Sequence, residues 1–169
     1  RDEAAARGLT TFRRLTRGAN GHEHPVFTPD GSRLLWVQND GTDRVSWMAA
    51  PVEGGLDLGT PARVRYLRSL GKPDFHPDGT RLVNDEYSPY ETYYGYTDLF
   101  AYDLRTQEYR RLTRGARARE PAHSLDGRRL AGVSRFGLRN QLVILDLQTR
   151  DFGVVSRDAA SPVWLPDSR

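Results

Sequence analysis

Short apolar runs separated by polar turn residues recur along the whole chain, a pattern that predicts β-strands. Residues 98–104 alternate apolar and polar side chains, as a half-buried strand does. The Asp-Gly pair within residues 77–80 tolerates the positive φ of a tight hairpin. One antiparallel sheet is therefore expected in this part of the chain, with strands at residues 73–76, 81–84, 98–104 and 109–113.

One phrase recurs and divides the chain into units of similar length. It runs Phe-Thr-Pro-Asp-Gly in its first copy, and related copies follow along the sequence. The aspartates of the four copies are spaced by 48, 48 and 41 residues. A period of roughly 40–50 residues with short strands is typical of propeller blades. The four aspartates are Asp30, Asp78, Asp126 and Asp167.

The repeat predicts an all-β fold, a partial β-propeller of four-stranded antiparallel blades. We expect one propeller segment over residues 1–169, with three complete blades and a half blade at each end. A longer propeller and a half-propeller whose copies self-associate to close the ring are both compatible with this pattern. The complete blades span approximately residues 25–70, 73–113 and 121–156, and the half blades supply an outer strand at 10–16 and an inner strand at 162–165.

The repeated phrase resembles the blades of the TolB-like (PD40, WD40-like) propeller family. The likeness covers Pro-x-Phe-x-Pro-Asp-Gly-x-x-Leu, a third strand ending in Asp-Leu, and Arg-Leu-Thr in the fourth strand. Leu125 replaces the proline in the third copy, and Ser168 replaces the glycine in the fourth. The resemblance implies a six-bladed ring and a periplasmic or cell-envelope location, although the cytoplasm stays possible. TolB itself binds a peptidoglycan-associated lipoprotein and colicins, and similar blades adjoin catalytic domains in peptidases.

Composition limits the kinds of partner and site that we expect for this chain. The formal charge is +3, the basic residues are scattered among acids, and Lys72 is the only lysine, so we expect no nucleic-acid partner. The absence of cysteine excludes a disulfide framework and a thiol nucleophile. No stretch approaches the roughly 18 apolar residues of a transmembrane helix. No catalytic motif is evident, and we expect no cofactor and no metal.

Two groups of polar residues have structural interpretations. The repeated aspartates suit hairpin turns, where Asp bonds its own backbone, and we expect the turns to lie well apart on one rim. Residues His22, Glu23 and His24 would bring two imidazoles to one face of a strand, as a metal site requires. No third ligand is evident, so we interpret this stretch as a polar inter-blade loop.

A tyrosine-rich connection is the strongest candidate for recognition. It spans residues 85–97, between the second and third strands of the second blade. Tyrosine combines apolar area with a hydrogen-bonding tip, although the rings could instead pack on the neighbouring blade. In a four-stranded meander this connection emerges at the same end as the inter-blade links. The predicted partner-binding residues are Tyr87, Tyr90, Tyr93, Tyr94, Tyr96, His22, His24, Arg117, Arg119 and Glu120.

The sequence therefore favours a non-catalytic scaffold that binds a protein or peptide through this loop face. The alternative is the propeller domain of a larger hydrolase, such as a peptidase, whose catalytic residues lie outside this chain. More blades beyond the chain would favour the first hypothesis, and a hydrolase motif would favour the second.

Overall fold

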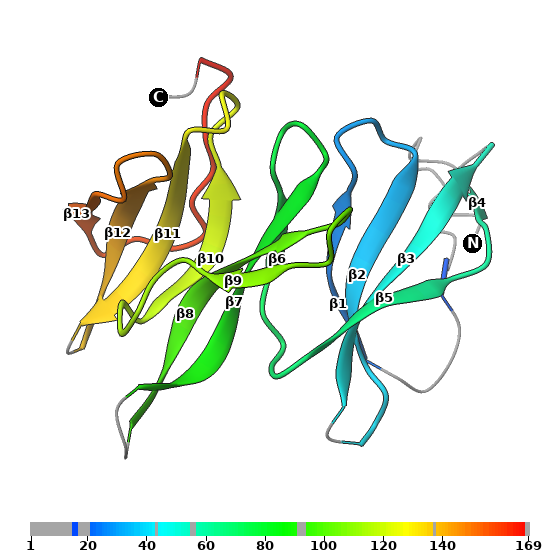
Figure 1. Cartoon of the computed structure of the whole chain (residues 1–169), viewed down its shortest axis with the longest axis horizontal. Helices are drawn as coiled ribbons and strands as arrows, with labels where there is room; N and C mark the ends of the chain where they lie inside the picture. Colours follow the sequence, from blue (N-terminus) through cyan, green and yellow to red (C-terminus); the bar gives the residue numbers. More distant parts are fainter. Residues whose placement is uncertain are drawn as a thin grey trace, which may run out of the picture.

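Three antiparallel sheets follow one another along the chain and stand side by side (Figure 1). The computed structural model describes residues 15–16, 21–42, 44–54, 57–90, 94–136 and 138–167, with Tyr90 described by its backbone. All elements within these ranges are strands. No helix among them has the length and apolarity to cross a membrane. This is the partial propeller of four-stranded blades that the repeat predicts.

The first blade is built from β1 (Gly21–Phe27), β2 (Arg33–Asn39), β3 (Val45–Glu53) and β5 (Ala62–Leu67). A two-residue strand, β4 (Asp57–Leu58), pairs with the end of β3 and extends this sheet at its edge. The residues expected to form a polar loop around His22 belong instead to β1, which corrects the sequence interpretation. The ladder is interrupted beyond Glu23 by a bulge, where Pro25 has no N–H to donate.

The second blade contains β6 (Pro73–Phe75), β7 (Arg81–Tyr90), β8 (Tyr94–Asp103) and β9 (Tyr109–Arg111). The tyrosine-rich stretch was expected to be a loop, but it forms a long hairpin in which β7 and β8 stay paired. Alternating Tyr, Ser and Thr side chains favour the extended backbone, and this preference outweighs the polar character that suggested a loop. The hairpin extends beyond the rest of its sheet (Figure 1).

The third blade contains β10 (Ala118–His123), β11 (Arg129–Phe136), β12 (Arg139–Asp146) and β13 (Phe152–Arg157). Its innermost strand begins before the position that the sequence suggested. Arg119 is therefore part of the ladder, paired with Val133, and not part of a link.

The two predicted half blades do not form strands among the described residues. Residues 10–14 of the outer strand lie outside the described residues, and residues 15–16 form no strand. The predicted inner strand at 162–165 is also not a strand. Its Trp164 side chain attaches it to the third blade, because the indole Nε1 donates to the Ala122 carbonyl oxygen at 2.9 Å. The Arg129 guanidinium lies 4.8 Å from the Trp164 ring centroid.

Two hydrophobic clusters lie between neighbouring blades. Trp47 of the first blade is fully buried and belongs to one cluster with Leu82 of the second. Leu99 of the second blade belongs to another cluster with Leu130 and Leu145 of the third. Each such side chain contributes roughly 1.5–3 kcal/mol by leaving water. The blades are therefore held together by side chains that alternate along the strands and face the neighbouring sheet.

The Asp-Gly turns have the geometry that the sequence predicts. The Asp78 carboxylate accepts a hydrogen bond from the Thr80 backbone N–H at 2.9 Å, and Gly79 has a φ of 72°. The turns lie at the edge opposite the β7–β8 hairpin (Figure 1). Consecutive turns of the first three copies lie close together, which corrects the expectation that the turns are well apart. Asp30 and Asp78 line one hollow of about 530 Å³, because each turn packs on its neighbour in the next blade.

The third blade carries an exposed apolar face. Ala131 and Ile144 pair across β11 and β12 as Val83 and Ala101 pair across β7 and β8. In the second blade this face packs against the third blade. In the third blade it borders a hollow of about 490 Å³, and Val155 is 59% exposed. The repeat therefore presents one more inter-blade surface, without a fourth blade among the described residues.

Candidate functional site

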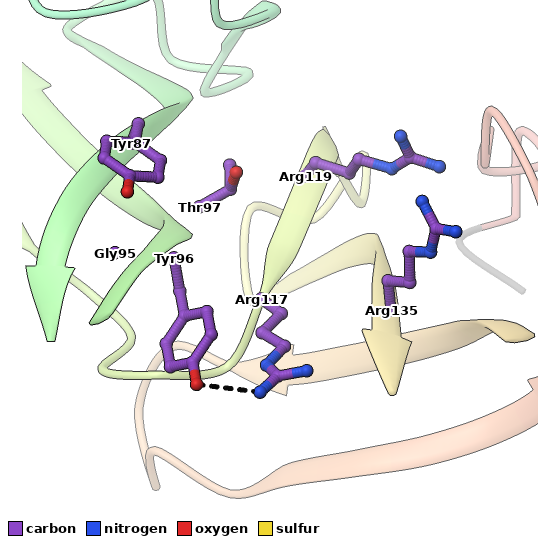
Figure 2. A pocket seen from close by; sticks show the side chains of 7 residues that line it. All are labelled: Tyr87, Gly95, Tyr96, Thr97, Arg117, Arg119 and Arg135. Atoms are coloured by element: carbon purple, nitrogen blue, oxygen red, sulfur yellow. Dashed lines mark hydrogen bonds between the residues drawn. The ribbon is translucent and has the colours of Figure 1, made fainter. Parts of the chain in front are cut away.

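A groove of about 380 Å³ lies where the β7–β8 hairpin meets the third blade (Figure 2). The hairpin supplies one wall and β10 and β11, with the residue that precedes β10, supply the other. The hairpin wall is aromatic and polar, whereas the opposite wall is formed by guanidinium groups. The residues that line the groove are Tyr87, Gly95, Tyr96, Thr97, Arg117, Arg119 and Arg135.

The aromatic wall is fixed by contacts within the hairpin. The rings of Tyr94 and Tyr96 are parallel to within 1°, with centroids 6.3 Å apart. The Tyr87 ring lies over Gly95, where a Cβ would come within 1.9 Å of the Tyr87 hydroxyl oxygen. Gly95 therefore makes room for the tyrosine that closes this end of the groove.

Arg117 joins the two walls. Its Nη2 donates a hydrogen bond to the Tyr96 hydroxyl oxygen at 2.8 Å, as Figure 2 shows. Its guanidinium carbon lies 4.1 Å from the Tyr96 ring centroid and 5.7 Å from that of Phe136. Arg117 is thus held by both a cation–π contact and a hydrogen bond, which orders it before any ligand arrives.

The link that carries Arg117 is anchored by a buried carboxylate. Asp98 is a fully buried residue in the middle of β8. It accepts hydrogen bonds from the backbone N–H groups of Gly115 at 2.9 Å and Ala116 at 3.0 Å. It also accepts from Arg111 Nη2 at 2.5 Å and from the Thr113 hydroxyl at 2.8 Å. Because the chain reaches Arg117 directly after these bonds, Asp98 positions one wall of the groove.

Arg119 and Arg135 form the far part of the basic wall, and they extend from different strands with their guanidinium groups near each other in Figure 2. Arg119 Nη2 donates to Asn140 Oδ1 at 3.4 Å, and its Nε lies 3.6 Å from Glu120 Oε1. The Arg135 backbone N–H donates to the Arg117 carbonyl, which ties the two strands together. Among the described residues, the Arg135 guanidinium has no hydrogen-bond or ion-pair partner. This part of the groove therefore carries an excess of positive charge.

The structure brings four of the predicted residues to the groove: Tyr87, Tyr96, Arg117 and Arg119. Tyr94 packs behind Tyr96. Tyr93 and the Tyr90 side chain lie outside the described part of the chain. The hairpin and the link between the second and third blades thus lie at the same end of the sheets, as the expected four-stranded meander implies.

The other predicted residues lie elsewhere. The His22 ring stacks on Trp36 in the first blade, with centroids 6.2 Å apart. His24 Nε2 lies 3.8 Å from Glu23 Oε2. Glu120 Oε2 accepts the Ser161 backbone N–H at 2.8 Å. Within the described residues, no three His, Asp or Glu side chains are placed to hold a metal ion.

Sequence reasoning missed three lining residues. Gly95 and Thr97 lie in the tyrosine-rich segment, but only the aromatic residues were selected from it. Arg135 ends the second strand of the third blade, a position that emerges at the same end as the hairpin of the second blade. Aligning the repeats places the end of this strand beside the hairpin of the second blade, so Arg135 could have been predicted from the sequence.

The fold can be compared with known proteins. A scan against models of protein families finds no match, and a search of curated protein sequences finds none either. Solved structures do match. A TolB-like protein from Agrobacterium tumefaciens superposes with a TM-score of 0.68 at 15% identity, over 91% of this chain and 57% of that one.

The chain has a TolB-like propeller fold. An oligogalacturonate lyase in complex with manganese matches with a TM-score of 0.58 at 16% identity, over 80% of this chain and 38% of that one. The β-propeller domain of the Trilobed protease from Pyrococcus furiosus matches at 0.53 and 14% identity, over 82% and 42%. This chain spans 57% of the length of the Agrobacterium protein and less than half of the other two. At such identities, the likeness concerns the fold.

Proposed function

We propose that this TolB-like chain is a non-catalytic scaffold that binds a protein or peptide through the groove between the β7–β8 hairpin and the third blade. The observation that carries the proposal is the groove itself, which two tyrosines and three arginines line together. Tyr and Arg are enriched among residues that dominate binding energy. Tyrosine gives large contact area at low entropic cost, because it has few rotatable bonds.

The ordering of Arg117 supports a binding role. Its contacts with Tyr96 hold the guanidinium in place in the free protein. A side chain that is already ordered loses less conformational entropy when a partner binds. The hairpin that forms one wall of the groove also projects beyond its own sheet (Figure 1).

The TolB-like repeat also suggests where the protein works. TolB-type propellers operate in the bacterial envelope, so we infer a periplasmic or envelope location for this chain. The alternative is the propeller domain of a larger hydrolase, and the fold that this chain shares with the propeller domain of the Trilobed protease is compatible with it. In that case the groove would receive a substrate or a neighbouring domain.

Self-association to close the ring stays a prediction. The exposed face around Ile144 and Val155 is the surface that a further blade would cover. Light scattering over a range of protein concentrations tests this prediction. A constant monomeric mass would contradict it.

Panning a library of displayed random peptides on the immobilised chain tests the binding proposal. We expect peptides whose binding falls at least about tenfold when Tyr87 and Tyr96 are replaced by alanine, because such contacts contribute about 1.4 kcal/mol or more. Tyr66→Ala is the matched control, since Tyr66 is half exposed in the first blade and away from the groove. Failure to enrich any peptide above an unrelated propeller would refute the proposal.

A further inference from the structure

The hairpin that forms the groove has an open strand edge. The innermost strand β6 pairs with β7 only as far as Asn84. The outermost strand β9 pairs with β8 from Phe100 onward. Between Tyr94 and Thr97, no described strand lies beside the outer edge of β8. An unpaired edge offers backbone N–H and C=O groups to any extended segment that reaches it.

The ladder shows which backbone groups point toward this edge. The Leu99 N–H donates to Thr113 Oγ1 at 3.0 Å, and the Leu99 carbonyl accepts from the Leu112 N–H at 2.8 Å. The backbone of Leu99 therefore faces away from β7. Because successive residues of a strand alternate, the backbone groups of Thr97 and Gly95 face the same way. Both residues line the groove, and Gly95, which has no side chain, lines it with its backbone atoms.

We propose that the groove binds an extended acidic peptide, which adds as a strand along Gly95–Thr97 and places carboxylates on Arg119 and Arg135. This inference rests on the proposed binding function and names the ligand class. Strand addition provides backbone hydrogen bonds, and side-chain pockets provide specificity. Guanidinium groups suit this specificity because they bind carboxylates through paired, charge-assisted hydrogen bonds.

The charges of the groove favour an acidic ligand. Arg117, Arg119 and Arg135 line it, and among the described residues only Glu120 forms an ion pair with any of them. Arg119 Nε is buried and has no hydrogen-bond partner within the described residues. A ligand carboxylate would supply the acceptor that this N–H lacks, and would reduce the mutual repulsion of the guanidinium groups.

The aromatic contacts favour a peptide over a single-stranded nucleic acid. Nucleic acids would also supply negative charge, but their bases bind by stacking on exposed aromatic faces. The Tyr96 ring is already stacked with Tyr94 and covered by Arg117. The Tyr87 ring lies over Gly95. Tyr96 is therefore engaged within the protein and Tyr87, which is 57% exposed, is the one groove ring with a free surface, whereas stacking of a nucleic-acid strand uses successive aromatic rings.

Fluorescence anisotropy with a short labelled peptide of alternating Glu and Thr tests the inference. The same peptide with Gln in place of Glu should bind at least about tenfold more weakly. Arg135→Gln should reduce affinity for the Glu peptide by a similar factor and leave affinity for the Gln peptide unchanged. Arg135 is exposed, so this variant is expected to fold normally. Arg105→Gln is the control, because Arg105 is exposed in the turn between β8 and β9, at the other end of β8 from the groove.

Backbone pairing has its own measurement. Two forms of the Glu peptide are compared, one methylated at the amide nitrogens of its odd-numbered residues and the other at those of its even-numbered residues. One form should bind about tenfold more weakly than the unmethylated peptide and the other nearly as tightly, since only alternate residues of an added strand face β8. Equal binding of the two methylated forms would overturn strand addition. Equal binding of the Glu and Gln peptides, or tighter binding of a single-stranded oligonucleotide, would overturn the acidic-peptide assignment.

The panning experiment separates this inference from the function on which it rests. Enrichment of neutral peptides that depend on Tyr87 and Tyr96 would uphold the scaffold and overturn the acidic ligand. Enrichment of acidic peptides whose affinity depends on Arg119 and Arg135 would support both. No enrichment would refute the scaffold itself.

Discussion

Replacement of Asp98 by asparagine is the sharpest test of how the groove is held. Asp98 is fully buried, and each of its oxygens accepts two hydrogen bonds. The isosteric amide keeps one oxygen, which can still accept from Thr113 and Ala116. The other position becomes an NH₂ group that faces two donors, Arg111 Nη2 and the Gly115 N–H. The variant therefore changes hydrogen bonding and charge with almost no change in volume.

The magnitude follows from these contacts. A hydrogen bond to a charged group contributes about 1.5–3 kcal/mol, so the loss of two corresponds to about 3–6 kcal/mol. The loss of one partner of a buried ion pair costs about 3–5 kcal/mol by independent measurements. Domains have about 5–15 kcal/mol of stability in total. We therefore expect Asp98→Asn to lower the free energy of unfolding by at least about 3 kcal/mol.

Urea denaturation followed by circular dichroism measures this loss. The midpoint should fall while the m-value stays constant, because the change affects stability and not the surface exposed on unfolding. Asp158→Asn is the control, since the Arg139–Asp158 pair is exposed and its removal should leave the midpoint nearly unchanged. A loss below about 1 kcal/mol in Asp98→Asn would refute the role given to this network.

Three further predictions concern stability. Gly71→Ala should destabilise strongly, because its Cβ would lie 1.5 Å from a backbone carbonyl oxygen, whereas Gly153→Ala has open space and should leave the urea midpoint nearly unchanged. Gly79→Val should cost about 1 kcal/mol or more in the same assay, since a branched residue resists a φ of 72°, and an unchanged midpoint would contradict that cost. Hydrogen bonds lower the pKa of Asp30 from 3.8 to about 2, and the bond from the Thr28 hydroxyl has the largest effect. The stability from this depressed pKa is present above pH 3.8 and is lost as pH falls toward 2, so thermal midpoints of Asp30→Asn should decline less over this interval than those of the parent protein.

Much of the fold was predictable because the repeat encodes it. The Asp-Gly turn, the alternating third strand and the fixed spacing each indicate a blade, and all agree. The site was less predictable. Tyrosines suggested a recognition loop, but pairing between Tyr87 and Thr97 continues the strands. Local composition does not reveal such pairing, because it depends on residues from both strands at once.

The buried Asp98 network was also beyond the sequence analysis. Asp98 was included as an ordinary polar position of an alternating strand. Its partners lie on the following strand and link, and only the packed structure shows that they converge on one carboxylate. Arg135 differs, because the register of the repeat already places it beside the hairpin end.

The location of the cores between blades has a consequence for how the protein unfolds. Trp47 and Leu82 connect the first two blades, and Leu99 and Leu130 connect the last two. The chain thus behaves as a linear array with nearest-neighbour coupling. The third blade has one such interface and an open face, so its amide protons in β13 should exchange with solvent earlier than those of the central blade. Loss of the third blade would then expose Leu99 and detach the basic wall of the groove, so ligand binding and the order of unfolding are coupled through the same surface.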